Sequence, residues 1–207
     1  MNSNRTLAFI VCIVSSIASQ AMAAPLGLIR ENSPDIMSSF IDVSYDSGTD
    51  AFSATGFALT LVDDVDSHDF DGGFGGFSLF ATIDSSGAAA AGSLSITGSV
   101  DVHSGPTLLT GDLVDFGWVD GTTDLYEFVF EVTGGDLATP AFYGTAGSTF
   151  GVIFTSIGTT FGAPDYWDDS FGSSGSSFSD TATLIPEPSS LVILGLGAFA
   201  LLRRSRG

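Results

Sequence analysis

The nine residues FIDVSYDSG, at positions 40–48, indicate what kind of fold this chain adopts. Within them, residues 40–45 alternate between two sets, which are Ile41, Val43 and Tyr45 on one side and Phe40, Asp42 and Ser44 on the other. A period of two is that of a β-strand, whose successive side chains point to opposite faces. The residues that follow, 46–48, are Asp, Ser and Gly, which favour turns. The sequence therefore predicts a strand that ends in a tight turn.

Clusters of the same size recur along the chain, and turn residues separate them. They lie at 51–62, 77–83, 93–100, 108–118, 125–133 and 149–155. The dipeptide Asp120-Gly121 favours a hairpin between two of them. Residues 84–92 could make one helical turn, and residues 156–184 form a final strand pair or a loose tail. Seven or eight short strands predict an all-β, antiparallel β-sandwich or jelly roll in one domain, residues 24–184.

Residues 185–207 differ in composition from this predicted domain. They contain Pro186, Glu187 and Pro188, then an apolar run from Leu191 to Leu202, and then three basic residues, Arg203, Arg204 and Arg206. The two prolines favour an extended segment, so that helix can begin only at about Ser189. A helix over the apolar run would be ~18 Å long, well short of the ~30 Å hydrocarbon core of a bilayer. This length predicts a transient membrane span rather than a permanent one.

This order of Pro-Glu-Pro, apolar helix and arginine cluster resembles the PEP-CTERM sorting signal, which exosortase recognises. The resemblance implies a membrane-inserted precursor that is cut near Pro186, with the arginines on the cytoplasmic side. The alternative is an ordinary C-terminal membrane anchor. More weakly, the runs at 93–98, 108–113 and 126–135 resemble uncharacterised β domains found with such tails, which supports the fold and implies no activity.

The N-terminus carries the features of a secretory signal peptide, residues 1–23. Arg5 supplies the positive charge, residues 7–17 are mostly apolar, and Ala21-Met22-Ala23 is a small-x-small cleavage pattern before Ala24. Signal peptidase is therefore an expected transient partner. The one cysteine, Cys12, lies inside this segment, so the mature protein has no thiol and no disulfide.

The predicted mature body is strongly acidic. The chain has no lysine, and Arg30 is the one basic residue between the two processed ends, against 23 of the 24 acidic residues, so residues 24–185 carry a formal charge of −22. Such a surface repels nucleic acid and anionic lipid headgroups. The body is nevertheless expected to fold, because 44% of the chain is hydrophobic and its apolar residues form strand-sized clusters.

No catalytic motif stands in the sequence, so we expect a protein that is not an enzyme. His68 and His103 are the two histidines, they fall in different predicted loops, and neither a Gly-x-Ser-x-Gly elbow nor a His-Glu-x-x-His motif is present. Glu127 and Glu131 share a strand face that is expected to be solvated, since Phe128 takes the other face.

One acidic segment is a candidate calcium site. Asp64, Asp66, Asp69 and Asp71 could converge on Ca²⁺ from an extended loop, with Gly72 and Gly73 allowing the chain to return. The segment lacks the glycine and glutamate positions of an EF-hand loop. A second candidate is Asp165, Asp168 and Asp169 beside Tyr166 and Trp167, whose rings could stack on a sugar. The alternative for both is a solvated loop whose aspartates cap turns.

Three classes of function remain open at this stage. The first is an exported, non-catalytic protein of the cell surface or extracellular matrix, associated with biofilm or exopolysaccharide and placed through its tail. The second is a Ca²⁺-dependent carbohydrate-binding module that uses Trp118, Tyr166 or Trp167 to hold extracellular polysaccharide. The third is a secreted hydrolase of glycans or esters.

Overall fold

The computed structural model describes residues 25–30, 33–64, 66–101, 103–119, 124–156 and 166–183 of the 207-residue chain. The strands are β1 (Ile29–Arg30), β2 (Asp35–Asp46), β3 (Ala51–Asp63), β4 (Asp66–Asp69), β5 (Gly75–Ile83), β6 (Ala89–Thr97), β7 (Thr107–Val119), β8 (Asp124–Gly134), β9 (Thr149–Ser156) and β10 (Phe171–Thr183). Two single turns of 3-10 helix, η1 (Asp71–Gly73) and η2 (Tyr166–Asp168), are the helical elements of this part of the chain. The predicted all-β class is confirmed.

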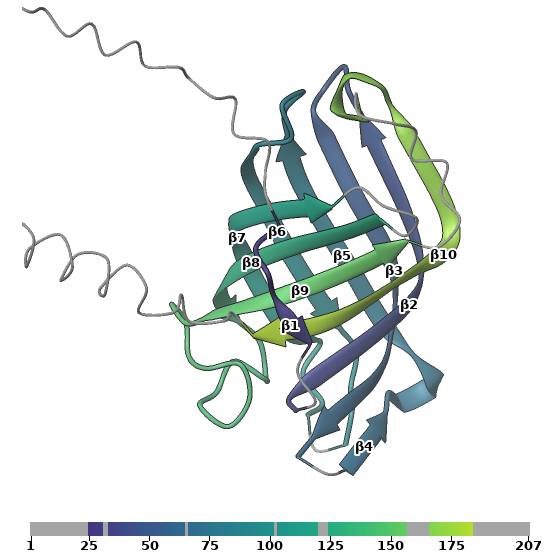
Figure 1. The fold of residues 1–207 in the computed structure, drawn as a ribbon. Helices are drawn as coiled ribbons and strands as arrows, with labels where there is room; N and C mark the ends of the chain where they lie inside the picture. Colours follow the sequence, from purple (N-terminus) through teal and green to yellow (C-terminus); the bar gives the residue numbers. More distant parts are fainter. Residues whose placement is uncertain are drawn as a thin grey trace, which may run out of the picture.

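The strands form one antiparallel sheet that closes on itself. Its order is β10-β2-β3-β5-β6-β7-β8-β9, and β9 pairs with β10 again, so that eight strands make a barrel (Figure 1). The expectation of a two-sheet sandwich or jelly roll is thus corrected in its detail. Closure follows from β10, which pairs with β2 through its first part and with β9 through its second. From β2 to β9, apart from β4, strands that follow one another in the sequence are also neighbours in the sheet. Such an order has none of the long crossover connections of a jelly roll.

The interior of the barrel is filled by large apolar side chains. Those with less than 2% of their surface exposed include Phe52, Phe77, Phe128, Phe130 and Phe154. The alternation at 40–45 is confirmed, because Ile41, Val43 and Tyr45 are buried while Phe40, Asp42 and Ser44 are exposed. Aromatic rings contact one another within this interior, for example the tilted rings of Phe116 and Phe128 with centroids 4.7 Å apart. The barrel is therefore a packed core rather than a container.

A β-bulge interrupts β2 and sets the direction of its side chains. The register with β3 shifts between Ser39 and Asp42, and Phe40 has a φ of 52°, in the left-handed region that non-glycine residues rarely adopt. Gly56 lies opposite on β3, where a Cβ atom would meet Ile41 Cγ1 at 2.7 Å. Close approach of the two backbones thus needs glycine at position 56. The bulge places Ile41 inside the barrel and leaves Phe40 outside it.

The alanine-rich segment at 84–92 is a hairpin connection rather than a helical turn. Asp84 Oδ1 accepts hydrogen bonds from the amides of Ser86 and Ala88 at 2.8 and 3.1 Å and from the Ser86 hydroxyl at 2.6 Å. These bonds hold the pKa of Asp84 below its ordinary value. An aspartate that organises the loop in this way favours a turn, after which the alanines start β6.

Candidate functional site

The strand β10 is the part of the described structure that leads into the C-terminal tail. It ends at Thr183, and β1 pairs with it there, with Ile29 opposite Thr183 and Arg30 opposite Ala182. The predicted sorting and processing residues lie outside the described residues. These are Ala21, Ala23, Pro186, Glu187, Pro188, Arg203, Arg204 and Arg206. The structure therefore shows the base of the tail and not the tail itself.

A buried polar network fixes the base of the tail through Thr181. The Thr181 hydroxyl donates to Asp35 Oδ1 at 2.8 Å, and the Thr181 amide donates to the same oxygen at 2.9 Å. The hydroxyl oxygen accepts from the Ile36 amide at 3.0 Å and lies 2.9 Å from the Tyr143 hydroxyl. Because the one hydroxyl proton of Thr181 goes to Asp35, Tyr143 is the donor in that contact. One donor and two acceptor positions of Thr181 are thus all used.

The carboxyl group of Asp35 is the charged member of this network. Its side chain is buried, and burial raises its pKa above the ordinary value of 3.8, although the hydrogen bonds from Thr181 act in the opposite direction. The nearby Asp180 carboxylate raises the pKa further, and Arg30 lowers it. Burial also raises the pKa of Tyr143, which keeps its hydroxyl protonated as a donor. Asp35 therefore ties the start of β2 to the end of β10.

An ion pair and a short strand complete the base of the tail. Arg30 Nη1 lies 2.8 Å from Asp180 Oδ2, with 55% of the arginine side chain and 14% of the aspartate side chain exposed. An exposed pair of this kind contributes little to stability, about 0–1 kcal/mol. Its effect here is local, because it neutralises a carboxylate three residues before the end of β10.

The residues just after the predicted signal cleavage site lie across the outside of the barrel. Glu127 Oε1 accepts a hydrogen bond from the Leu28 amide at 2.8 Å, and Oε2 accepts one from the Gly27 amide at 3.0 Å. Leu28 packs on Val129 and Ile153, which belong to β8 and β9. Figure 1 shows the purple β1 segment running across the outside of these strands. We call residues 25–30 the N-terminal strap.

The strap corrects the expectation for Glu127. The side chain does face outward from β8, as its strand parity predicts, but the strap covers it and leaves it 2% exposed, while Glu131 on the same face is exposed. A buried carboxylate with two amide donors is a structural clamp, because its oxygens are already occupied. No local pattern in the sequence shows that a segment 100 residues away will cover this position.

Both ends of the body therefore leave the barrel at one place. Arg30 and Ala182 are neighbours on paired strands, the predicted cleavage site at Ala23–Ala24 lies six residues before Arg30, and Pro186 lies four residues after Ala182. Among the described residues, the two ends of the body therefore meet where β1 pairs with the end of β10. No local pattern in the sequence predicts this arrangement, since it depends on the pairing of β1 with β10.

The acidic segment at 63–71 is a hairpin and a short turn rather than one open loop. Asp63 pairs with Asp66, and Asp69 pairs with Thr60, so that Asp66 and Asp69 belong to opposite faces of β4. The Asp71 carboxylate accepts a hydrogen bond from the Ser99 hydroxyl at 2.7 Å, while the Asp64 amide donates to Ser33 Oγ. Within the described ranges no group of three or more His, Cys, Asp or Glu side chains is placed to hold a metal ion. Calcium binding here stays a prediction.

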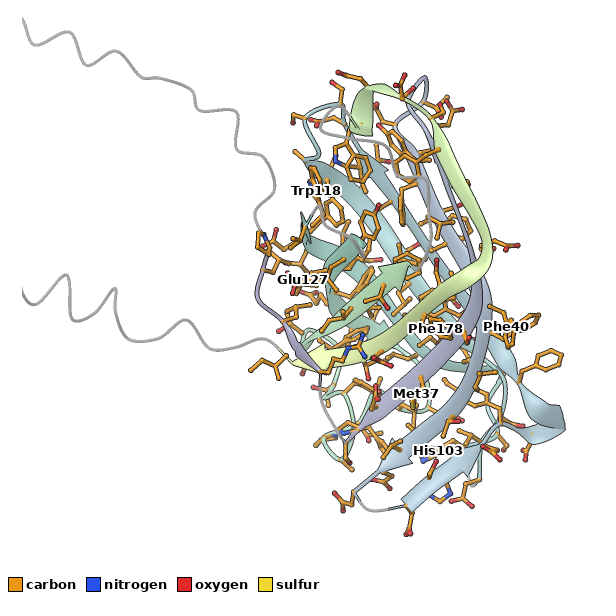
Figure 2. The ribbon with its side chains drawn as sticks, turned by 45° about the vertical axis from the view of Figure 1, so that its right-hand side comes forward. Met37, Phe40, His103, Trp118, Glu127 and Phe178 are labelled. Atoms are coloured by element: carbon orange, nitrogen blue, oxygen red, sulfur yellow. The ribbon has the colours of Figure 1, made fainter. Side chains whose placement is uncertain are left out.

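The tryptophans expected to hold a sugar are part of the core. Trp167 is 3% exposed, and its ring meets Tyr45 edge-on with centroids 4.9 Å apart. Trp118, labelled in Figure 2, is 9% exposed. Gly87 lies against both tryptophans, since a Cβ atom added to it would be 2.8 Å from Nε1 of Trp118 and 2.8 Å from Nε1 of Trp167. The use of Trp118 and Trp167 as exposed stacking platforms is therefore wrong. The side chain of Tyr166 and residue Asp165 lie outside what the structure describes.

The two histidines also stay apart. His68 lies on β4, paired with Leu61, whereas His103 follows the isolated bridge residue Val100 and packs edge-on against Phe142 with ring centroids 4.9 Å apart.

Comparison with known proteins identifies the tail, and the match does not extend into the barrel. Residues 184–206 carry the PEP-CTERM protein-sorting motif. The motif begins at the residue that follows β10, so the strand fixed by Thr181 and Asp35 is the one that carries the motif. It marks the chain as an exported protein that passes through the membrane on its way to exosortase. No curated protein and no solved structure matches the chain. Among the described residues, no helix reaches the length and hydropathy that a membrane crossing needs.

Proposed function

We propose that this chain is a non-catalytic structural protein of the cell surface or extracellular matrix, which the PEP-CTERM tail delivers and exosortase processes. The observation that carries the proposal is the direct connection of the motif to a fixed strand end. Two residues, Leu184 and Ile185, separate the last paired residue of β10 from Pro186. With such a short connection, the folded barrel is the part of the protein that the tail carries to exosortase.

The filled interior of the barrel supports the same proposal. A small-molecule site is usually a concave pocket with a few convergent polar groups. The space enclosed by the described strands holds packed phenylalanines instead, and the buried polar groups Asp35, Thr181 and Glu127 are satisfied by other parts of the chain. These features suit a durable module that is displayed rather than one that turns over a substrate.

The test is the mass of the mature protein in cells with and without exosortase. The expected result is a polypeptide that begins at Ala24 and ends close to Pro186–Pro188, and that accumulates uncut when exosortase is absent. A matched pair of variants separates recognition from folding: Glu187→Ala alters the motif, while Glu131→Ala removes an exposed acid of the barrel. A secreted form that retains residues 191–207 in the presence of exosortase would refute processing.

The exclusion of catalysis has its own test. The purified body, residues 24–185, should leave a panel of glycans and esters unchanged. Release of sugar or acid that tracks with the folded protein through purification would overturn this part of the proposal.

A further inference from the structure

A row of exposed apolar side chains crosses the outside of the barrel, from the strand that carries the tail to β2, β3 and the loop before β5. We call it the phenylalanine patch, and it consists of Met37, Phe40, Phe57, Phe74 and Phe178. These side chains are 40–61% exposed. Large apolar groups gathered on a surface in this way mark sites of protein or membrane interaction.

Strand register shows that the patch is continuous. Phe178 on β10 lies between Ser177, which pairs with Ile41, and Ser179, which pairs with Ser38, so it stands beside the bulge at Phe40. Figure 2 shows Phe178, Phe40 and Met37 close together on one side of the barrel. On the far side of β2, Phe57 pairs with Ser39, and its ring contacts Phe74 with centroids 4.6 Å apart. Three strands and one loop thus contribute to a single surface.

The bulge in β2 is what brings Phe40 into the patch. A residue with φ near +50° is strained unless it is glycine, asparagine or aspartate, and here it is a phenylalanine that is 61% exposed. The bulge would place Ile41 inside the barrel whatever the side chain at position 40, so an aromatic residue is not needed there for packing. The side chain of Phe40 therefore gains nothing from the core and is available to a partner.

The position of the patch relative to the tail indicates the partner. Phe178 lies five residues before the end of β10, or roughly 17 Å along the strand. Residues 184–190 then join Thr183 to the apolar run that starts at Leu191, and seven residues span at most about 25 Å. While that run is in the membrane, the β10 end of the barrel cannot move far from the lipid surface. A tether of this length gives the patch an effective concentration on the order of millimolar at that surface.

Two of the carboxylates near Phe178 are paired or buried, whereas at the other end of the patch Asp71 of η1 lies three residues before Phe74. Asp180 is paired with Arg30, and Asp35 is buried beneath β10, where its pKa is raised. The exposed Asp42 marks the edge of the patch, two residues beyond Phe40. An acidic body is repelled by anionic lipids and by a second copy of itself, but a zwitterionic surface has no net charge to repel it.

From this placement we propose that the phenylalanine patch rests on the zwitterionic bilayer surface while the tail still anchors the precursor. The inference depends on the proposed function, since the tail must be in the membrane for the tether to act. Docking would hold the barrel at one orientation, with Pro186 presented next to the membrane where the tail is cut. Once the tail is removed, the tether is lost and a patch of this size no longer retains the protein.

The absence of cysteine from the mature chain allows a direct measurement. Residues 24–207, which keep the tail and lack Cys12, are reconstituted in phosphatidylcholine vesicles, and a polarity-sensitive NBD label is attached at Phe40→Cys, Phe178→Cys or, as control, Val114→Cys. Val114 is 57% exposed on β7, four strands away from β2 around the barrel. The expected result is a blue shift and quenching by spin-labelled lipid at positions 40 and 178, with position 114 still reporting water.

A second experiment places the label at a position outside the substituted residues, so that the effect of the substitutions is not mixed with that of the label. A label at the exposed Thr55→Cys is read with the patch intact and with Phe40→Ser and Phe178→Ser together. Both replaced side chains face water, so the barrel should keep its strand signature in circular dichroism. The double variant should lose at least half of the blue shift; an unchanged shift would overturn the proposal.

Two further outcomes also count against lipid docking. Equal signals at positions 40, 178 and 114 would show that the surface is not selected. A shift at positions 40 and 178 that grows with protein concentration and needs no vesicles would assign the patch to self-association. Exosortase cleavage is measured separately, by mass. If cleavage is normal but the labels at positions 40 and 178 report water, docking is refuted and the proposed function is not. If the labels report lipid but cleavage fails, the proposed function is refuted and docking is not.

Discussion

Replacing Thr181 with valine tests whether the buried network holds the base of the tail. Valine has nearly the shape of threonine and keeps the backbone amide that donates to Asp35 Oδ1. The substitution removes the hydroxyl bond to Asp35, the acceptor for the Ile36 amide and the partner of Tyr143. The change is therefore confined to hydrogen bonding at one buried oxygen.

The expected loss follows from the number of bonds at that oxygen. A buried hydrogen bond contributes about 1 kcal/mol net, so the loss of three contacts predicts a destabilisation of at least about 3 kcal/mol, to which any charge on Asp35 adds. For a body of ~160 residues, each kcal/mol lowers the melting temperature by about 2–4 °C. Thr181→Val should therefore lower it by about 6–12 °C near neutral pH.

The loss should also depend on pH, through Asp35. Its pKa in the folded protein is raised above 3.8, so between 3.8 and that raised value the folded state binds more protons than the unfolded state. Stability associated with this group is therefore present below pH 3.8 and decreases as the pH rises through the folded pKa. Because the Thr181 hydroxyl lowers that pKa, its removal should enlarge the decrease, and the variant's deficit should be greater at pH 7 than at pH 4.

Thermal unfolding of residues 24–185, followed by far-ultraviolet circular dichroism at pH 4 and pH 7, measures both effects. Thr55→Val makes the same chemical change at an exposed site on the outside of β3, and it should alter stability by no more than about 0.5 kcal/mol. If Thr181→Val and Thr55→Val have the same melting temperature at pH 7, the network does not stabilise the end of β10 and the reasoning is wrong.

Three other predictions concern single features of the fold. Glu127→Gln removes the negative charge from the clamp on the strap and should increase amide hydrogen exchange at Gly27 and Leu28 at least tenfold, whereas Glu131→Gln should not; equal protection in both variants would contradict the clamp. Gly56→Ala should cost about 2 kcal/mol or more in urea unfolding, because its Cβ would lie within 3 Å of Ile41; a neutral result would mean that the bulge shifts freely. Millimolar Ca²⁺ should raise the melting temperature more than Mg²⁺ at equal concentration or NaCl at matched ionic strength, with a gain of about 2.7 kcal/mol at a hundredfold excess over Kd. That increment should vanish in the double variant Asp64→Asn, Asp66→Asn, and equal responses to all three salts would leave the hairpin as a solvated acidic turn.

The sequence predicted what depends on neighbours along the chain. Alternation at 40–45 gave the correct inward and outward faces of β2, because a strand's period of two is a local property. The same reasoning located the other strand-sized clusters. For residues 156–184 it allowed a final strand pair or a loose tail, and the described part of that segment forms one strand, β10. The Asp84 turn was ambiguous, since alanines suit a helix and only the aspartate's bonds to Ser86 and Ala88 select the hairpin.

Contacts between distant segments decided the rest. Closure of the sheet depends on β10 reaching both β2 and β9, and no pattern within residues 171–183 records that. Burial of Glu127 depends on the strap, and burial of Trp167 depends on Tyr45, which is 122 residues earlier in the chain. Trp167 beside Asp168 and Asp169 suggested a binding surface. A tryptophan ring buries a large apolar area, however, and Trp167 lies in the core.

Mechanical load on the finished protein would enter through the last residues of β10. At Ala182 that strand is paired on both sides, with Gly151 of β9 and with Arg30 of β1. A pull along the strand must shear two hydrogen-bonded ladders at once instead of peeling one strand from a free edge. In moving water, a barrel held by its C-terminal end would therefore resist extraction of its final strand where the force is greatest.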